Sequence, residues 1–108
     1  MYEEATGSIR ELGNTGPLVG IFDSVSYRDI SFSMNSGDCL FLYTDGLIES
    51  MPENSREMYG PHRLQENFKN YVEQSSIDIV HSMVGSFYEY TNYSWQEDDL
   101  TIICIKKT

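Results

Sequence analysis

The stretch GDCLFLYTDGLIE, residues 37–49, decides the fold predicted for this chain. It opens at the turn-forming residues 35–38 and continues as an apolar run, residues 39–44, of the length of one strand. Because polar residues do not alternate within this run, we expect a central strand that is buried on both faces. The run ends at Asp45-Gly46, which puts a carboxylate at a strand end, where functional side chains are often found.

Downstream of this stretch the pattern changes from strand to helix. Pro61 suits the first turn of a helix whose apolar residues are Leu64, Phe68, Tyr71 and Val72. A capping box, in which Ser75 caps and Asp78 reaches back, opens a second helix. Its apolar face recurs at helical spacing and comprises Ile79, Val80, Met83, Val84 and Phe87. Gly85 weakens this helix, which we interpret as tolerated for close packing. Residues 100–105 form a final β-branched strand.

Upstream, two segments alternate apolar and polar residues and are predicted to be strands. These are residues 8–12 and residues 25–34, the second with a bulge near Ile30 where the alternation changes phase. Residues 14–17 form a turn signal between them. The order of two or three strands, two helices and one strand predicts an α+β fold. In it, antiparallel strands carry two helices packed on one sheet face.

Composition limits the classes of partner. The chain has 108 residues, with 17 acidic and 7 basic side chains and a formal charge of −10. Such a surface repels nucleic-acid phosphates and anionic lipids, so we expect neither nucleic acid nor membrane contact. No apolar stretch is long enough to span a bilayer, and the N-terminus lacks a signal-peptide pattern. The two cysteines, Cys39 and Cys104, lie in apolar runs and are expected to be reduced thiols in a cytoplasmic protein.

Two acidic motifs flank the two best strand candidates. Asp45 follows one strand directly, and Asp98-Asp99 precedes the other. If these strands are neighbours in one sheet, Asp45 and Asp98 converge, and oxygen ligands of this kind suit Mg²⁺ or Mn²⁺. On residue types alone, a turn-forming Asp45 and a solvated Asp98-Asp99 loop explain the same pattern more simply than a metal site does. Asp38 is expected to form a turn under either interpretation.

The sequence motifs around these acids resemble those of a known family. Residues 37–49 resemble the GD-x-L-x-LYTDG-[VIL]-x-E segment of PPM-type serine/threonine phosphatases, in the bacterial branch typified by SpoIIE and the Rsb phosphatases. Residues 59–64, YGPHRL, are similar to its FG-x-x-RL helix start, and residues 96–103, QEDDLTII, to its Q-x-DD-[IL]-T ending. Residues 16–21, GPLVGI, resemble its G-x-PLG-[IL] turn. The motifs occur in the family's order.

The resemblance implies a fold, a site and an activity. The fold is part of an α-β-β-α sandwich, and the activity is metal-dependent hydrolysis of phosphoserine or phosphothreonine with two Mn²⁺ or Mg²⁺ ions. Asp45 and Asp98 match metal ligands, while Asp99 and Glu49 match acids with further roles at the ions. Gly46 and Thr101 match supporting positions, and the resemblance implies no catalytic residue beyond the metal ligands. The implied partner is a phosphorylated protein, such as an anti-sigma-factor antagonist in bacterial signalling.

One part of the family's pattern has no match in this sequence. The GD-x-x-D element and the glycine-rich GHG-like segment of the family's first half are not found. We therefore expect residues 1–108 to be the C-terminal portion of one SpoIIE-like phosphatase domain and to be inactive alone. The alternative is a non-catalytic regulatory module with a phosphatase-like fold, which binds a partner or forms a homodimer through exposed sheet edges.

Overall fold

A single antiparallel sheet forms the base of the fold. The computed structural model describes residues 1–13, 16, 19–93 and 98–108. The sheet has the strand order β2-β1-β3-β4 and is built from β1 (Tyr2–Glu3), β2 (Ser8–Ile9), β3 (Cys39–Tyr43) and β4 (Ile102–Lys106). β3 and β4 pair along their full length, from Cys39↔Lys106 to Tyr43↔Ile102, whereas β1 meets β3 only at Tyr2↔Cys39. The α+β class predicted from the sequence is confirmed.

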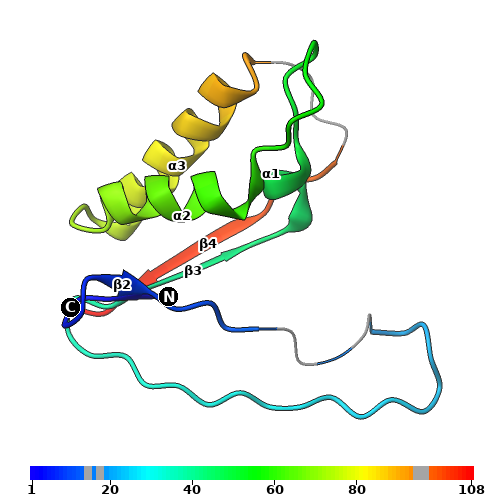
Figure 1. Ribbon diagram of the computed structural model, residues 1–108. Helices are drawn as coiled ribbons and strands as arrows, with labels where there is room; N and C mark the ends of the chain where they lie inside the picture. The colour runs from blue at the N-terminus through cyan, green and yellow to red at the C-terminus, as the bar shows by residue number, and fades with distance from the viewer. Residues whose placement is uncertain (14–15, 17–18, 94–97) are drawn as a thin grey trace.

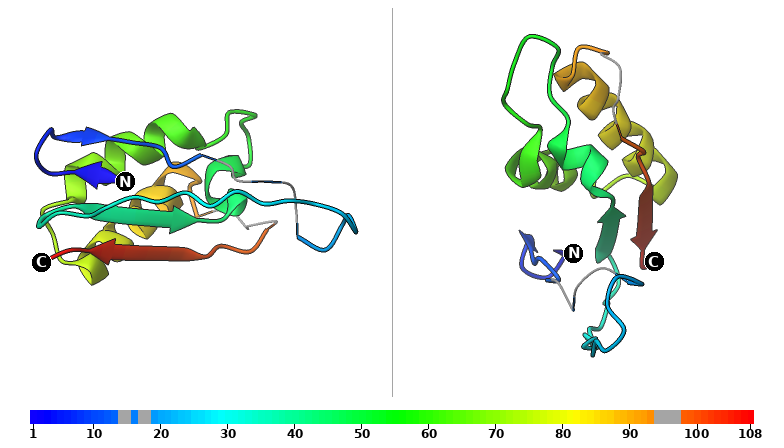
Figure 2. Two further views of the ribbon diagram at one scale, coloured as in Figure 1. Left: turned by 90° about the horizontal axis from the view of Figure 1, so that it is seen from below. Right: turned by 90° about the vertical axis from the view of Figure 1, so that its right-hand side faces the viewer.

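Three helices complete the described structure: α1 (Asp45–Glu49), α2 (Gly60–Tyr71) and α3 (Ser76–Tyr90). Figures 1 and 2 show that α2 and α3 lie together on one side of the sheet, as predicted, while the extended chain before β3 runs on the other side. The core lies between the helices and the inner face of β3 and β4. Its buried residues are Cys39, Phe41, Leu47, Tyr59, Leu64, Phe68, Val72, Ile79, Met83 and Phe87.

Local sequence signals set the limits of the two long helices. Ser75 caps α3, and its Oγ accepts a hydrogen bond from the Asp78 N–H at 3.3 Å. The described contacts include no return bond from the Asp78 carboxylate, so only half of the predicted capping box forms. At the end of α2, Lys106 Nζ donates to the carbonyls of Val72 and Gln74 at 2.7 and 2.8 Å. This cation occupies the negative end of the helix dipole and ties α2 to β4.

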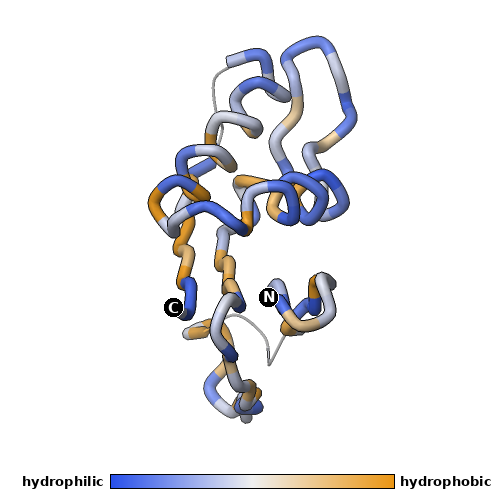
Figure 3. Tube along the Cα trace, turned by 90° about the vertical axis from the view of Figure 1, so that its left-hand side faces the viewer, coloured by the Kyte–Doolittle hydropathy of each residue, from blue (hydrophilic) through white to orange (hydrophobic). Residues whose placement is uncertain are grey.

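The burial predicted for β3 is wrong on one face. Phe41 is 8% exposed beneath the helices, but Leu42 on the opposite face is 44% exposed. On neighbouring β4, Ile103 and Ile105 are 52% and 48% exposed. Figure 3 shows the apolar colouring of both strands. The apolar run correctly indicated a strand in the middle of the sheet, but the outer face of β3 and β4 stays partly exposed in the part of the chain that the structure describes.

Residues 25–34 do not form the predicted strand. The chain is extended there but has no ladder partner among the described residues, and Tyr27, Ile30 and Phe32 are 44%, 44% and 41% exposed. Alternation indicates a strand only where a neighbouring strand supplies hydrogen bonds. Of the predicted turn at residues 14–17, only Gly16 belongs to the described residues, and the motif residues Gln96 and Glu97 lie outside them. Gly85 also differs from expectation, because a Cβ there would meet nothing within 4 Å.

The two thiols face each other across β3 and β4. Cys39 is buried and Cys104 is half-buried, and both are free. Their sulfurs lie 3.4 Å apart, within hydrogen-bonding distance. This contact lowers the pKa of the Cys39 thiol and raises that of Cys104. The prediction of small packing side chains is confirmed for Cys39, whereas Cys104 keeps partial access to solvent.

Asp38 forms the predicted turn and also joins it to the turn that follows β1. Asp38 is 3% exposed, and its carboxylate accepts hydrogen bonds from the N–H groups of Asn35 and Glu4 at 2.8 and 2.9 Å. These bonds lower the pKa of Asp38 below its ordinary value of 3.8. Ionised Asp38 therefore stabilises the folded state above that value, and the contribution disappears as pH falls through the folded pKa.

We predict that Asp38→Asn destabilises the chain at pH 7, because an amide nitrogen cannot accept the second hydrogen bond. The wild-type chain should lose stability as pH falls below 3.8, so its advantage over the variant should shrink there. Thermal unfolding of both proteins over a pH series measures this difference. Stability curves that stay parallel down to low pH would contradict the assigned role.

Candidate metal site

Asp45 lies at the junction of β3 and α1. Thr44 leaves the strand in an extended conformation at the N-cap position, and Asp45 is the first residue of α1. The Asp45 side chain is exposed at the helix N-terminus, where a negative charge is favoured. Glu49 is four residues further along the same helix and is also exposed, so both carboxylates share one helix face. The sequence predicted the acid at the strand end but left residues 47–51 unassigned.

Gly46 lets the second acidic motif approach the first. A Cβ built on Gly46 would lie 2.5 Å from the Asp99 carbonyl oxygen and 3.5 Å from the Asp98 Cβ. Such a contact with a backbone oxygen is too short for any side chain, so the position requires glycine. Residues 45–46 and 98–99 are therefore adjacent in space, as expected from the pairing of β3 with β4.

Thr44 adds a polar link between the two motifs. Its N–H donates to the Thr101 carbonyl at 3.1 Å, and its Oγ1 accepts from the Thr101 N–H at 3.0 Å. The same hydroxyl donates to the Asp99 carbonyl at 3.3 Å. Thr101, predicted as a supporting residue, thus contributes through its backbone. Sequence reasoning did not single out Thr44, because these contacts join residues more than fifty positions apart.

The four predicted acids form a region of uncompensated negative charge. Asp45, Glu49, Asp98 and Asp99 are all exposed, and none has an ion pair with a basic side chain among the described residues. Asp98 Oδ1 accepts a hydrogen bond from the Asp99 N–H at 2.8 Å. Carboxylates without cationic partners are suitable donors for a hard divalent cation, so the residues fit the implied metal.

The arrangement supplies only part of a metal site. Within the part of the chain that the structure describes, no group of three or more Asp, Glu, His or Cys side chains is placed to hold one ion. Divalent Mg²⁺ or Mn²⁺ bound by one or two carboxylates depends on water and other groups for its remaining ligands. The ligand roles of Asp45, Asp98, Asp99 and Glu49 therefore stay predictions.

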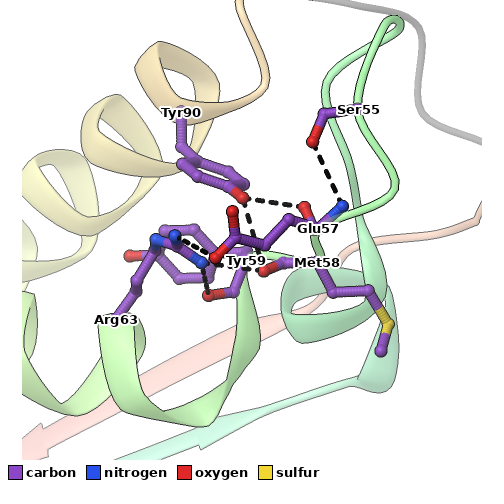
Figure 4. A network of polar contacts seen from close by, with 6 residues as sticks. All are labelled: Ser55, Glu57, Met58, Tyr59, Arg63 and Tyr90. Carbon is purple, nitrogen blue, oxygen red and sulfur yellow. Dashed lines mark hydrogen bonds and ion pairs between the residues drawn. The ribbon is translucent and has the colours of Figure 1, made fainter.

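Arg63 is held in a structural network and is not directed at the acidic motifs. Its guanidinium donates to the carbonyls of Met58 and Tyr59 at 3.0 and 3.3 Å, and it pairs with Glu57 Oε1 at 2.8 Å. It also lies 4.4 Å from the centre of the Tyr90 ring, whose hydroxyl donates to the Glu57 carbonyl at 2.7 Å (Figure 4). These contacts fasten the loop after α1 to α2 and α3.

An apolar cleft of about 600 Å³ opens beside β3, between the N-terminal hairpin and α2. Ile9, Leu12, Leu40 and Phe68 are among its lining residues, and Asp45 also contributes to the lining. Asp45 is therefore accessible from this cleft as well as from open solvent.

The family model described as Stage II sporulation protein E (SpoIIE) matches residues 1–108. The chain belongs to the SpoIIE family. This SpoIIE-family chain is 29% identical over 102 residues to Protein IcfG of Synechocystis sp., and the match covers 92% of the chain and 15% of IcfG. Membership identifies a phosphatase-like domain of the PPM type, as the motifs indicated.

A solved structure supports the fold independently. The SiaA-PP2C domain of Pseudomonas aeruginosa matches with a TM-score of 0.70 and 23% sequence identity, over 78% of the SpoIIE-family chain. The match covers 34% of the SiaA chain, so the present chain spans about a third of that relative and less of IcfG. The sheet with its helices is therefore a PP2C-like arrangement. In addition, no helix among the described residues is long and apolar enough to cross a membrane.

Proposed function

We propose that this chain is the C-terminal portion of a metal-dependent phosphoprotein phosphatase and contributes carboxylate ligands from two motifs. The observation that carries the proposal is the contact at Gly46, whose missing side chain lets Asp98 and Asp99 lie against the residue next to Asp45. Membership in the SpoIIE family supplies the chemical class. The unpaired charges of the four acids support cation binding over a structural ion-pair network.

In this proposal Asp45 and Asp98 would hold Mn²⁺ or Mg²⁺, with Asp99 and Glu49 at outer positions. When bound, the ions supply a water of lowered pKa and neutralise charge on the phosphoryl oxygens. The chain itself provides the carboxylates and fixes their separation through the backbone at Gly46. Further ligands come from outside residues 1–108, and we expect the chain to hydrolyse little phosphate ester by itself.

The substrate and setting follow from the same proposal. A phosphoserine or phosphothreonine on a small regulatory protein, such as an anti-sigma-factor antagonist, would be dephosphorylated in the cytoplasm. The net charge of −10 supports a protein substrate over nucleic acid, since the surface repels phosphate backbones.

We predict that Asp45→Asn lowers kcat/KM for a phosphopeptide by more than about 100-fold in the full-length natural protein with Mn²⁺. Losing a ligand should exceed the roughly 10–100-fold effect that is typical of outer-sphere partners. Asp78→Asn is the matched control, because it makes the same charge change in the first turn of α3, away from the acidic motifs. Equal activity of the wild type and the Asp45 variant would overturn the proposed role.

A self-associating module is the second candidate function. It is favoured by the half-exposed apolar outer face of the sheet, where Leu42, Ile103 and Ile105 are each between 44% and 52% exposed. An exposed apolar sheet face is a typical protein-contact surface. Calorimetric Mn²⁺ titration and sedimentation of the same sample separate the candidates. A dimer without a Mn²⁺ response supports the module, and a Mn²⁺ response lost in Asp45→Asn supports the phosphatase.

A further inference from the structure

The side chain of Thr44 behaves unlike that of Ser75, which also bears a hydroxyl at a helix N-cap position. Ser75 uses its hydroxyl to cap α3, whereas the Thr44 hydroxyl makes no capping bond to α1 although it occupies the same position. A helix whose N-cap side chain makes no hydrogen bond to the first turn is normally less stable than a capped one. The hydroxyl is directed instead across the sheet, to Thr101 and Asp99.

These contacts extend the pairing of β3 with β4 beyond the end of the ladder. The last paired residues are Tyr43 and Ile102. Thr44 continues the pairing to Thr101 through its backbone N–H, and its hydroxyl carries the connection on to the Asp99 carbonyl. The contact therefore joins the residue before Asp45 directly to Asp99 of the second acidic motif.

We propose that Thr44 is a positioning residue that sets the separation of the two acidic motifs for a divalent cation. The hydroxyl accepts from Thr101 N–H while it donates to the Asp99 carbonyl, and only a side-chain hydroxyl of this length does both. Gly46 permits Asp98 and Asp99 to lie close to α1, and the hydrogen bonds of Thr44 keep the two acidic motifs in this relative position. This inference rests on the proposed function, because it assigns Thr44 an effect on the cation site of that phosphatase.

The test compares Thr44→Val with Thr44→Ser in the full-length natural protein. Valine keeps the shape and the backbone hydrogen bond but removes the hydroxyl, whereas serine keeps the hydroxyl. Isothermal titration with Mn²⁺ alone is the main measurement, and thermal unfolding without metal is the second. We expect Thr44→Val to weaken Mn²⁺ binding about 10-fold or more, as typical outer-sphere partners do, with Thr44→Ser close to the wild type.

Each outcome of the Mn²⁺ titration supports or contradicts the role proposed for Thr44. Equal Mn²⁺ affinity in the wild type and Thr44→Val would overturn the role of Thr44 and leave the proposed function standing. A wild type without any Mn²⁺ response would overturn both together. Equal weakening in Thr44→Val and Thr44→Ser would show that the hydroxyl is not responsible. If Thr44→Val does not fold, Thr44→Ala is the second hydroxyl-free variant, and an affinity equal to that of the wild type overturns the inference.

Discussion

Gly46→Ala should weaken both folding and Mn²⁺ binding, although alanine is the better helix former. Gly46 has no positive φ and lies in α1, so intrinsic propensity alone favours alanine by about 1 kcal/mol. The new Cβ would, however, lie 2.5 Å from the Asp99 carbonyl oxygen. Relieving that contact must move either α1 or the backbone at Asp98 and Asp99, and such overpacking typically costs about 1–3 kcal/mol. The free energy of unfolding from urea denaturation and the Mn²⁺ affinity from titration measure the two effects.

Gly85→Ala is the matched control for this substitution. Gly85 lies in α3, and a Cβ there would meet nothing within 4 Å. Alanine should therefore raise the free energy of unfolding by about 0.5–1 kcal/mol and leave Mn²⁺ affinity unchanged. If the free energy of unfolding falls in Gly46→Ala and rises in Gly85→Ala, the close contact with the Asp99 carbonyl outweighs helix propensity at Gly46. A stabilising Gly46→Ala with wild-type metal affinity would show that the two acidic motifs are not held in contact.

The elements that sequence predicts well are those specified by nearby residues. The apolar run of β3, the helical spacing of Leu64 and Phe68, and the Ser75 cap all depend on neighbours a few positions away. The structure has each of them at the expected place. The adjacency of Asp45 and Asp98 was predictable for a related reason, because each acid flanks one of the two best strand candidates and those strands pair.

The features that sequence did not predict depend on segments distant along the chain. Residues 25–34 have the alternation of a strand, but a ladder needs a partner, and none is present among the described residues. Leu42 belongs to a run that looks buried on both faces, yet its exposure depends on whether another layer covers the sheet. Thr44 was overlooked because a hydroxyl beside an acid has many interpretations until its partners at Thr101 and Asp99 are known.

Phe87→Ala should cause the largest loss of stability of any single substitution considered for this chain. Phe87 is fully buried, and its ring meets the rings of Tyr59 and Tyr88 edge-on, with centroids 5.7 and 5.4 Å apart. Removing a buried phenylalanine typically costs about 3–5 kcal/mol, from lost burial and the cavity left behind. Small domains are stable by only about 5–15 kcal/mol, so the variant should be partly unfolded at 37 °C. Urea denaturation followed by circular dichroism measures the change.

Ile77→Ala in the same helix shows whether the loss belongs to the core or to the helix. Ile77 is 64% exposed in the first turn of α3, so its truncation should change the free energy of unfolding by less than about 0.5 kcal/mol. Both substitutions exchange an apolar residue for the best helix former, so helix propensity favours both variants. If only Phe87→Ala lowers the free energy of unfolding strongly, the stabilisation comes from the packing of α3 against Tyr59 and the rest of the core. A loss below about 1 kcal/mol at Phe87 would mean that α3 does not pack as described. The acidic motifs would then need another source of rigidity, because α3 and α2 together form the layer that covers β3 and β4.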